Sequence, residues 1–136
     1  MKKQKKKLYI SLLVTAVFIG VLSGKEEIEF HFSANKAFYY LENGEYILAA
    51  EEFDTLISMR PNIYELYINK AVALANSEKY EDALKTFLEA EKINNSDPEL
   101  YYNLAHLYDI TGNEELKQAC IEKGTELLFV KNIGEE

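Results

Sequence analysis

A chain of 136 residues allows one domain with a tail or an anchor, and its 48% apolar content and only two prolines exclude a largely disordered protein. The net charge of −8 is unevenly distributed, because residues 1–24 hold five lysines and no acid while the remainder holds ten basic and 23 acidic residues. The acidic part of the chain, residues 25–136, repels nucleic acid and anionic lipid surfaces. We therefore expect no nucleic-acid binding.

The N-terminus carries a membrane-targeting pattern. A basic cluster at residues 1–7 precedes seventeen uncharged residues, 8–24, which would span roughly 26 Å as a helix, at the short end for a bilayer. We expect an uncleaved membrane anchor, and the alternative is a signal peptide, although no A-x-A cleavage motif is present. Either way the lysines stay cytoplasmic, so the expected localisation is membrane-anchored with an extracytoplasmic domain, or secreted or periplasmic after cleavage.

A period of 34 residues organises the chain from about residue 33 to 128, behind a predicted charged connector at 25–32. The clearest unit is 64–97, where apolar residues recur at helical spacing on both sides of a polar turn. The same short motif returns in each unit, as Asn35-Lys36-Ala37, Asn69-Lys70-Ala71 and Asn103-Leu104-Ala105. Such a period predicts stacked helical hairpins, and about three are needed to cover the apolar flanks.

The predicted hairpins occupy about 30–63, 64–97 and 98–131. Pro61 closes the first, since proline cannot continue a helix interior, and Asp97 with Pro98 forms a helix start for the third. The last helix is expected to end near residue 128, followed by a tail at 129–136. No polar capping helix is visible, so we expect self-association or partner docking through the apolar residues of this C-terminal flank: Leu127, Leu128, Phe129, Val130 and Ile133.

From about Ser33 to Leu128 the chain resembles the tetratricopeptide repeat family. The central unit carries the family's apolar positions most completely, with Tyr67, Ala71, Leu74, Ala83, Phe87 and Ala90. Departures from the family pattern are Lys36 and Lys70 for leucine, Lys117 for alanine and Ser33 for an aromatic residue. The resemblance implies an all-α, right-handed superhelix of three stacked helix-turn-helix hairpins, here preceded by one hydrophobic N-terminal helix.

Few residues suit catalysis. Cys120 is the one cysteine and is expected to be a small buried hydrophobic residue, and His31 and His106 lack companions at metal-ligand spacing. No glycine-rich phosphate loop or GxSxG motif is present. We therefore expect no enzyme activity, no metal and no cofactor.

The resemblance also implies a concave groove, lined by the first helix of each hairpin, that holds an extended peptide or a partner helix. One groove column is Asn35, Asn69 and Asn103, whose carboxamides could bond a peptide backbone or, alternatively, cap or bridge locally. The flanking columns are largely apolar: Ile68 and Tyr102, and Phe38, Val72 and His106. Relatives that bind acidic C-terminal tails carry basic residues where Glu65 and Glu99 stand, so we expect no such binding.

These features predict a membrane-tethered adaptor that docks a protein partner through its repeats. One alternative is an exported peptide-binding chaperone or assembly factor, which follows if the leader is cleaved. Another is a regulatory subunit of an enzyme complex.

Overall fold

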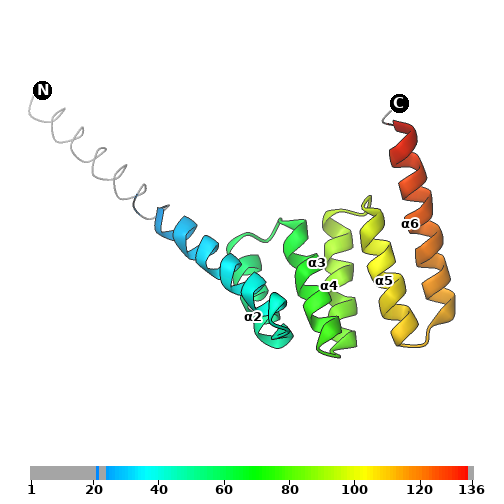
Figure 1. Ribbon diagram of the computed structural model, residues 1–136. Coiled ribbons are helices and arrows are strands. Elements are labelled where there is room, and N and C mark those ends of the chain that lie inside the picture. Colours follow the sequence, from blue (N-terminus) through cyan, green and yellow to red (C-terminus); the bar gives the residue numbers. More distant parts are fainter. Residues whose placement is uncertain (1–20, 22–23, 135–136) are drawn as a thin grey trace, which may run out of the picture.

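The computed structural model describes residue 21 and residues 24–134, and the described chain is built from helices joined by short turns (Figure 1). A first helix spans residues 24–42. It is followed by α2 (Tyr46–Met59), α3 (Tyr64–Asn76), α4 (Tyr80–Ile93), α5 (Pro98–Ile110) and α6 (Glu114–Gly134). These helices form three consecutive antiparallel pairs that stack side by side, as the 34-residue period predicts.

The turn inside each hairpin has the same geometry, one period apart. Gly44, Glu78 and Gly112 all adopt a positive φ, of 73°, 62° and 77°. The next residue donates its backbone N–H to a carbonyl five positions earlier in every hairpin, over 2.8 to 2.9 Å. This left-handed conformation at a helix end favours glycine, so Glu78 holds it at a cost of roughly 1 kcal/mol.

The core runs through the whole stack and alternates small and large side chains. Ala49, Ala71 and Ala83 are fully buried, which lets neighbouring helices approach closely. Phe53 and Phe87 occupy equivalent positions in α2 and α4 and are also buried. The predicted packing positions of the first two hairpins therefore form one continuous core.

The predicted connector, which could extend into the first repeat helix, and the predicted C-terminal tail are both helical. The predicted connector, residues 25–32, belongs to the first helix, because it contains no proline or glycine and its charges pair one turn apart. Lys25 lies 3.8 Å from Glu29, and His31 lies 3.1 Å from Glu27. The predicted tail is also helical as far as Gly134, since no helix-breaking residue occurs between 129 and 133.

The final turns of α6 extend past the ends of the neighbouring helices (Figure 1). Leu127 packs against the core, whereas Leu128, Phe129, Val130 and Ile133 are exposed. Self-association through this C-terminal flank stays a prediction.

The predicted membrane segment, residues 8–24, lies outside the described residues except for Val21 and Gly24. Among the helices that the structure describes, none is both long enough and apolar enough to cross a bilayer.

Candidate partner-binding surface

The structure brings three of the eight predicted groove residues into one small cavity. Val72 of α3 and Asn103 and His106 of α5 line a cavity of about 80 Å³. Its remaining walls come from α3, α4 and α5: Ala75, Asn76, Phe87, Leu107 and Ile110. The cavity thus joins the first helices of two successive hairpins and offers an apolar wall with two carboxamides, of Asn76 and Asn103, and one imidazole.

The predicted asparagine column differs in exposure along the stack. Asn35 is exposed, whereas Asn69 and Asn103 are half-buried. In the hydrogen bonds that the described residues make with one another, the side chains of these three asparagines take no part. A carboxamide offers two donors and an acceptor, so each can bond an incoming peptide backbone.

The remaining predicted groove residues lie outside this cavity. Ile68 is half-buried and packs against the core. Phe38 is 47% exposed and its ring meets Phe53 edge to face, with centroids 5.8 Å apart. The ring of Tyr102 lies against α6 where a Cβ on Gly124 would come within 3.0 Å of it, so this glycine makes room for the tyrosine. These three residues therefore make their contacts outside the cavity that Val72, Asn103 and His106 line.

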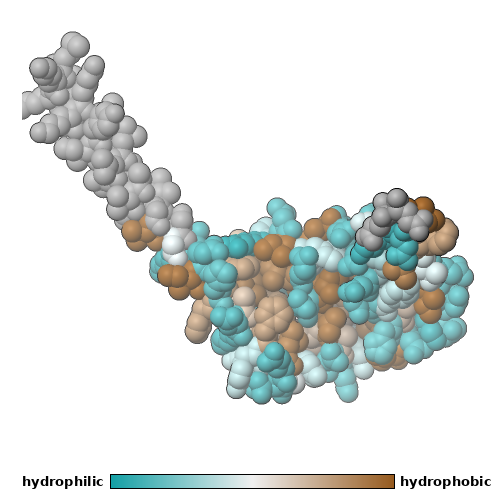
Figure 2. Space-filling view, turned by 45° about the horizontal axis from the view of Figure 1, so that its top comes forward, coloured by the Kyte–Doolittle hydropathy of each residue, from teal (hydrophilic) through white to brown (hydrophobic). Residues whose placement is uncertain are grey.

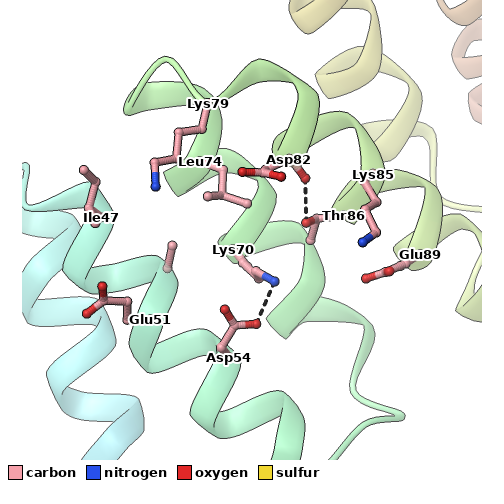
Figure 3. Close-up of a pocket in the computed structure, with 11 residues that line it drawn as sticks. Ile47, Glu51, Asp54, Lys70, Leu74, Lys79, Asp82, Lys85, Thr86 and Glu89 are labelled. Carbon is pink, nitrogen blue, oxygen red and sulfur yellow. Dashed lines mark hydrogen bonds and ion pairs between the residues drawn. The ribbon is translucent and has the colours of Figure 1, made fainter.

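A larger cleft, which sequence reasoning missed, lies between α2, α3 and α4 and has a volume of about 330 Å³ (Figure 3). Lys70 of α3 crosses it to bind Asp54 of α2 at 2.6 Å. The Thr86 hydroxyl donates to the backbone carbonyl of Asp82 over 2.8 Å. The rest of the lining combines charged residues of both signs with three apolar ones: Glu51, Lys79, Lys85, Glu89, Ile47, Ala50 and Leu74. Charged residues of both signs are common on surface helices, so they do not predict a cleft. The only unusual feature of the sequence at this cleft is Lys70, which stands where the family usually has leucine.

The three lysines that depart from the family pattern all form ion pairs between helices. Lys36 pairs with Glu52, Lys70 with Asp54, and Lys117 with Asp109 at 2.8 Å. The pairing with Lys117 holds the pKa of the Asp109 carboxyl below its usual range. At each of these positions the lysine forms an ion pair at the edge of the core. The leucine or alanine that is usual in the family would bury apolar surface there instead.

The Cys120 thiol of α6 and the nearby Tyr101 hydroxyl are held in their neutral forms. Partial burial, with Glu91 nearby, raises the pKa of the Cys120 thiol. Burial and a 3.0 Å hydrogen bond to Glu91 raise the pKa of Tyr101 to about 12. A thiol in such surroundings is a poor nucleophile. Over residues 24–134, no group of three His, Cys, Asp or Glu side chains is arranged to hold a metal ion.

Comparison with known families agrees with this geometry. The family model described as "TPR repeat" matches residues 73–109, and the one described as "Tetratricopeptide repeat" matches residues 98–127. Residues 73–127 of this chain therefore match tetratricopeptide repeat models. Among curated proteins, no sequence matches it.

Solved structures of the same fold include several MamA structures. The one titled "MamA MSR-1 C2" is 19% identical with a TM-score of 0.71, and the match covers 75% of this chain and 59% of that one. The "MamA RS-1 ArsTM double mutant" is 17% identical with a TM-score of 0.70, over 75% of this chain and 57% of that one. A chain of the "CopN-Scc3 complex" is 17% identical, with a TM-score of 0.67 over 72% of this chain and 58% of that one. This chain therefore spans a little under three fifths of the first of these structures.

Proposed function

We propose that this chain is a non-catalytic adaptor that holds a segment of a protein partner on its concave face. The observation that carries the proposal is the cavity in which Val72, Asn103 and His106 meet between two successive hairpins. Tetratricopeptide repeats bind protein partners, and one solved chain of the same fold belongs to a complex, the "CopN-Scc3 complex".

The chemistry of this surface suits an extended segment with alternating side chains. An apolar side chain of the segment would enter the cavity beside Val72, while the Asn103 carboxamide would bond its backbone. Asn69 and Asn35 continue the column along the preceding first helices. Since Glu65 and Glu99 are exposed near the start of α3 and α5, the segment is not an acidic C-terminal tail.

We further propose that residues 8–24 tether the protein to a membrane, with the repeats on the extracytoplasmic side. The support is the uncharged stretch behind five lysines. Because seventeen residues are short for a span, an exported chaperone or assembly factor with a cleaved leader is the alternative. N-terminal sequencing of the mature protein from membrane and released fractions separates the two.

The test of the partner-binding face is affinity capture of the partner by the full chain in a mild detergent. Changing Asn35, Asn69 and Asn103 together to alanine is expected to weaken partner binding at least tenfold, because three backbone hydrogen bonds are lost. Circular dichroism should show unchanged helix content, since Asn35 is exposed and the other two are only half-buried.

A matched control changes three exposed residues of α4 that line neither the cavity nor the larger cleft, Glu81, Leu88 and Lys92, to alanine. This variant is expected to capture the partner as well as the unchanged chain does. Undiminished capture by the asparagine variant would leave the concave face without a role in binding.

A further inference from the structure

The first helix leaves an apolar stripe uncovered at the N-terminal end of the stack. Ile28, Phe32 and Tyr39 recur four and seven residues apart and so share one face of helix 24–42. Their exposed fractions are 71%, 70% and 58%. Apolar surface is visible along the part of this helix that carries colour in Figure 2. A row of large apolar side chains in water marks an interaction surface.

The 34-residue period shows that two of these three positions are covered elsewhere in the chain, whereas the counterparts of Ile28 are the exposed residues Asn62 and Ser96 between hairpins. Phe32 corresponds to Leu66 of α3 and Leu100 of α5, and Tyr39 corresponds to Ala73 and Leu107. All four of these counterparts are buried. The stripe on the first helix is thus a stacking face of the repeat that has no cover among the described residues.

The element that covers this face in the later hairpins is the second helix of the preceding hairpin. α3 packs against α2, and α5 packs against α4. Lys70 shares the helix face of Leu66 and Ala73, and its ammonium binds Asp54 of α2. This face of α3 therefore packs against α2, which places Asp54 opposite Lys70.

The first helix keeps this lysine as well. Lys36 stands one period before Lys70, on the same helix face as Phe32 and Tyr39. It pairs with Glu52 of its own hairpin, and its side chain is 42% exposed, against 18% for Lys70. An additional helix on this face could therefore present an acid to Lys36, as Asp54 does to Lys70.

A second copy of this chain cannot supply that helix by head-to-tail stacking. The α2 face that meets α3 carries Ala50, Asp54 and Ile57, and its counterpart in α4 carries Leu84, Leu88 and Glu91. In α6 the same positions are Gln118, Glu122 and Thr125, all exposed. The α6 positions that correspond to this face of α2 are thus polar, so they offer no apolar surface for stacking another first helix in the same register.

The geometry points to a second docking surface on residues 28–39, whose occupant is an amphipathic helix from a partner protein. The occupant resembles α2: apolar residues seven positions apart with an acid between them, laid antiparallel along the first helix. It extends the stack by one helix from outside. This surface is separate from the concave face and does not depend on the function proposed for that face.

The probe is a synthetic peptide of residues 46–63, the sequence of α2 and its following turn, stapled into a helix through solvent-facing positions. It is titrated into the full chain in mild detergent, and backbone NMR shifts of residues 24–42 are followed. We expect saturable binding that weakens at least tenfold in the protein variant Phe32→Glu with Tyr39→Glu. Both side chains are exposed, so this variant is expected to fold.

Two further peptides act as matched controls. The α2 peptide carrying Asp54→Lys and a stapled peptide of residues 114–131 from α6 should each bind at least tenfold more weakly than the α2 peptide. Equal binding of the α6 peptide, or binding unaffected by the Phe32 and Tyr39 changes, would overturn the proposal. So would sedimentation as a dimer that the same two changes dissolve, because the face would then be covered by its own copy.

Discussion

Changing Phe87 to alanine is expected to lower the free energy of unfolding by about 3–5 kcal/mol. Phe87 lies in α4, the second helix of the central hairpin, and is 2% exposed. Removing its ring leaves a void among fully buried neighbours such as Ala71 and Ala83. Because each hairpin contacts only its neighbours, damage to the central one uncouples the two ends of the stack. Urea unfolding followed by circular dichroism measures the change.

Two control variants distinguish the effect of a cavity in the core from the effect of removing an aromatic ring at any position. Phe129→Ala removes a ring that is 67% exposed on α6, and is expected to change stability by less than about 0.5 kcal/mol. Phe87→Leu keeps most of the volume and should cost less than the alanine variant. If Phe87→Ala and Phe129→Ala proved equally mild, the central hairpin would not hold the core.

Changing Asp97 to alanine is expected to lower the free energy of unfolding by about 2–3 kcal/mol, because one carboxylate serves two elements. Its Oδ1 accepts the backbone N–H of Glu99 at 3.1 Å and caps α5. Its Oδ2 accepts the hydroxyl of Tyr64 at 2.9 Å, which joins the second hairpin to the third. Burial and this bond together raise the pKa of Tyr64 above its ordinary value, so the hydroxyl stays protonated and keeps donating.

Asp97→Asn is the matched control, because asparagine caps a helix as well as aspartate does. It keeps an acceptor for Glu99 and is expected to lose about 1 kcal/mol or less. Tyr64→Phe removes only the link between hairpins and should fall between the two. An alanine variant as stable as the asparagine variant would show that the cap contributes nothing here.

The repeat architecture can be predicted from the sequence because the 34-residue period recurs both in the residues that pack the core and in the residues that form the turns. The recurring Asn-x-Ala motif marks the first helix of each hairpin, the Ala-Phe positions mark the second helix of the first two, and the structure confirms the stacked pairs. The shared turn geometry is partly readable too, since Gly44 and Gly112 stand at the same position of the first and third hairpins. Glu78 holds the same conformation without glycine, which no local pattern announces.

The helix ends are harder to predict, because a run of charges is also typical of a surface connector. Residues 25–32 mix acids with apolar side chains, yet their charges pair along a helix surface. The C-terminal turns of α6 lack a stripe that would bury them, so periodicity gives no signal beyond residue 128. The turns of α6 that extend past the neighbouring helices lie outside the packed core, so hydrophobic patterns do not predict them.

The candidate site is only partly predictable for a geometric reason. The 34-residue period predicts on which face of its helix a residue lies. It does not predict how deep a cavity forms between two neighbouring helices. One cavity is lined by Val72, Asn103 and His106. The ring of Tyr102 instead packs against α6, because Gly124 has no side chain there. The mixed-charge cleft around Lys70 depends on contacts between three helices, which lie outside any single repeat.

The claim that the concave face holds the partner is tested most directly by photo-crosslinking. A benzophenone amino acid is placed in the full chain at His106, on the concave cavity, or at Leu88, on the exposed side of α4. The account predicts that the partner captured by the unchanged chain is crosslinked from position 106 and not from position 88. Crosslinking of that partner from position 88 alone would contradict it.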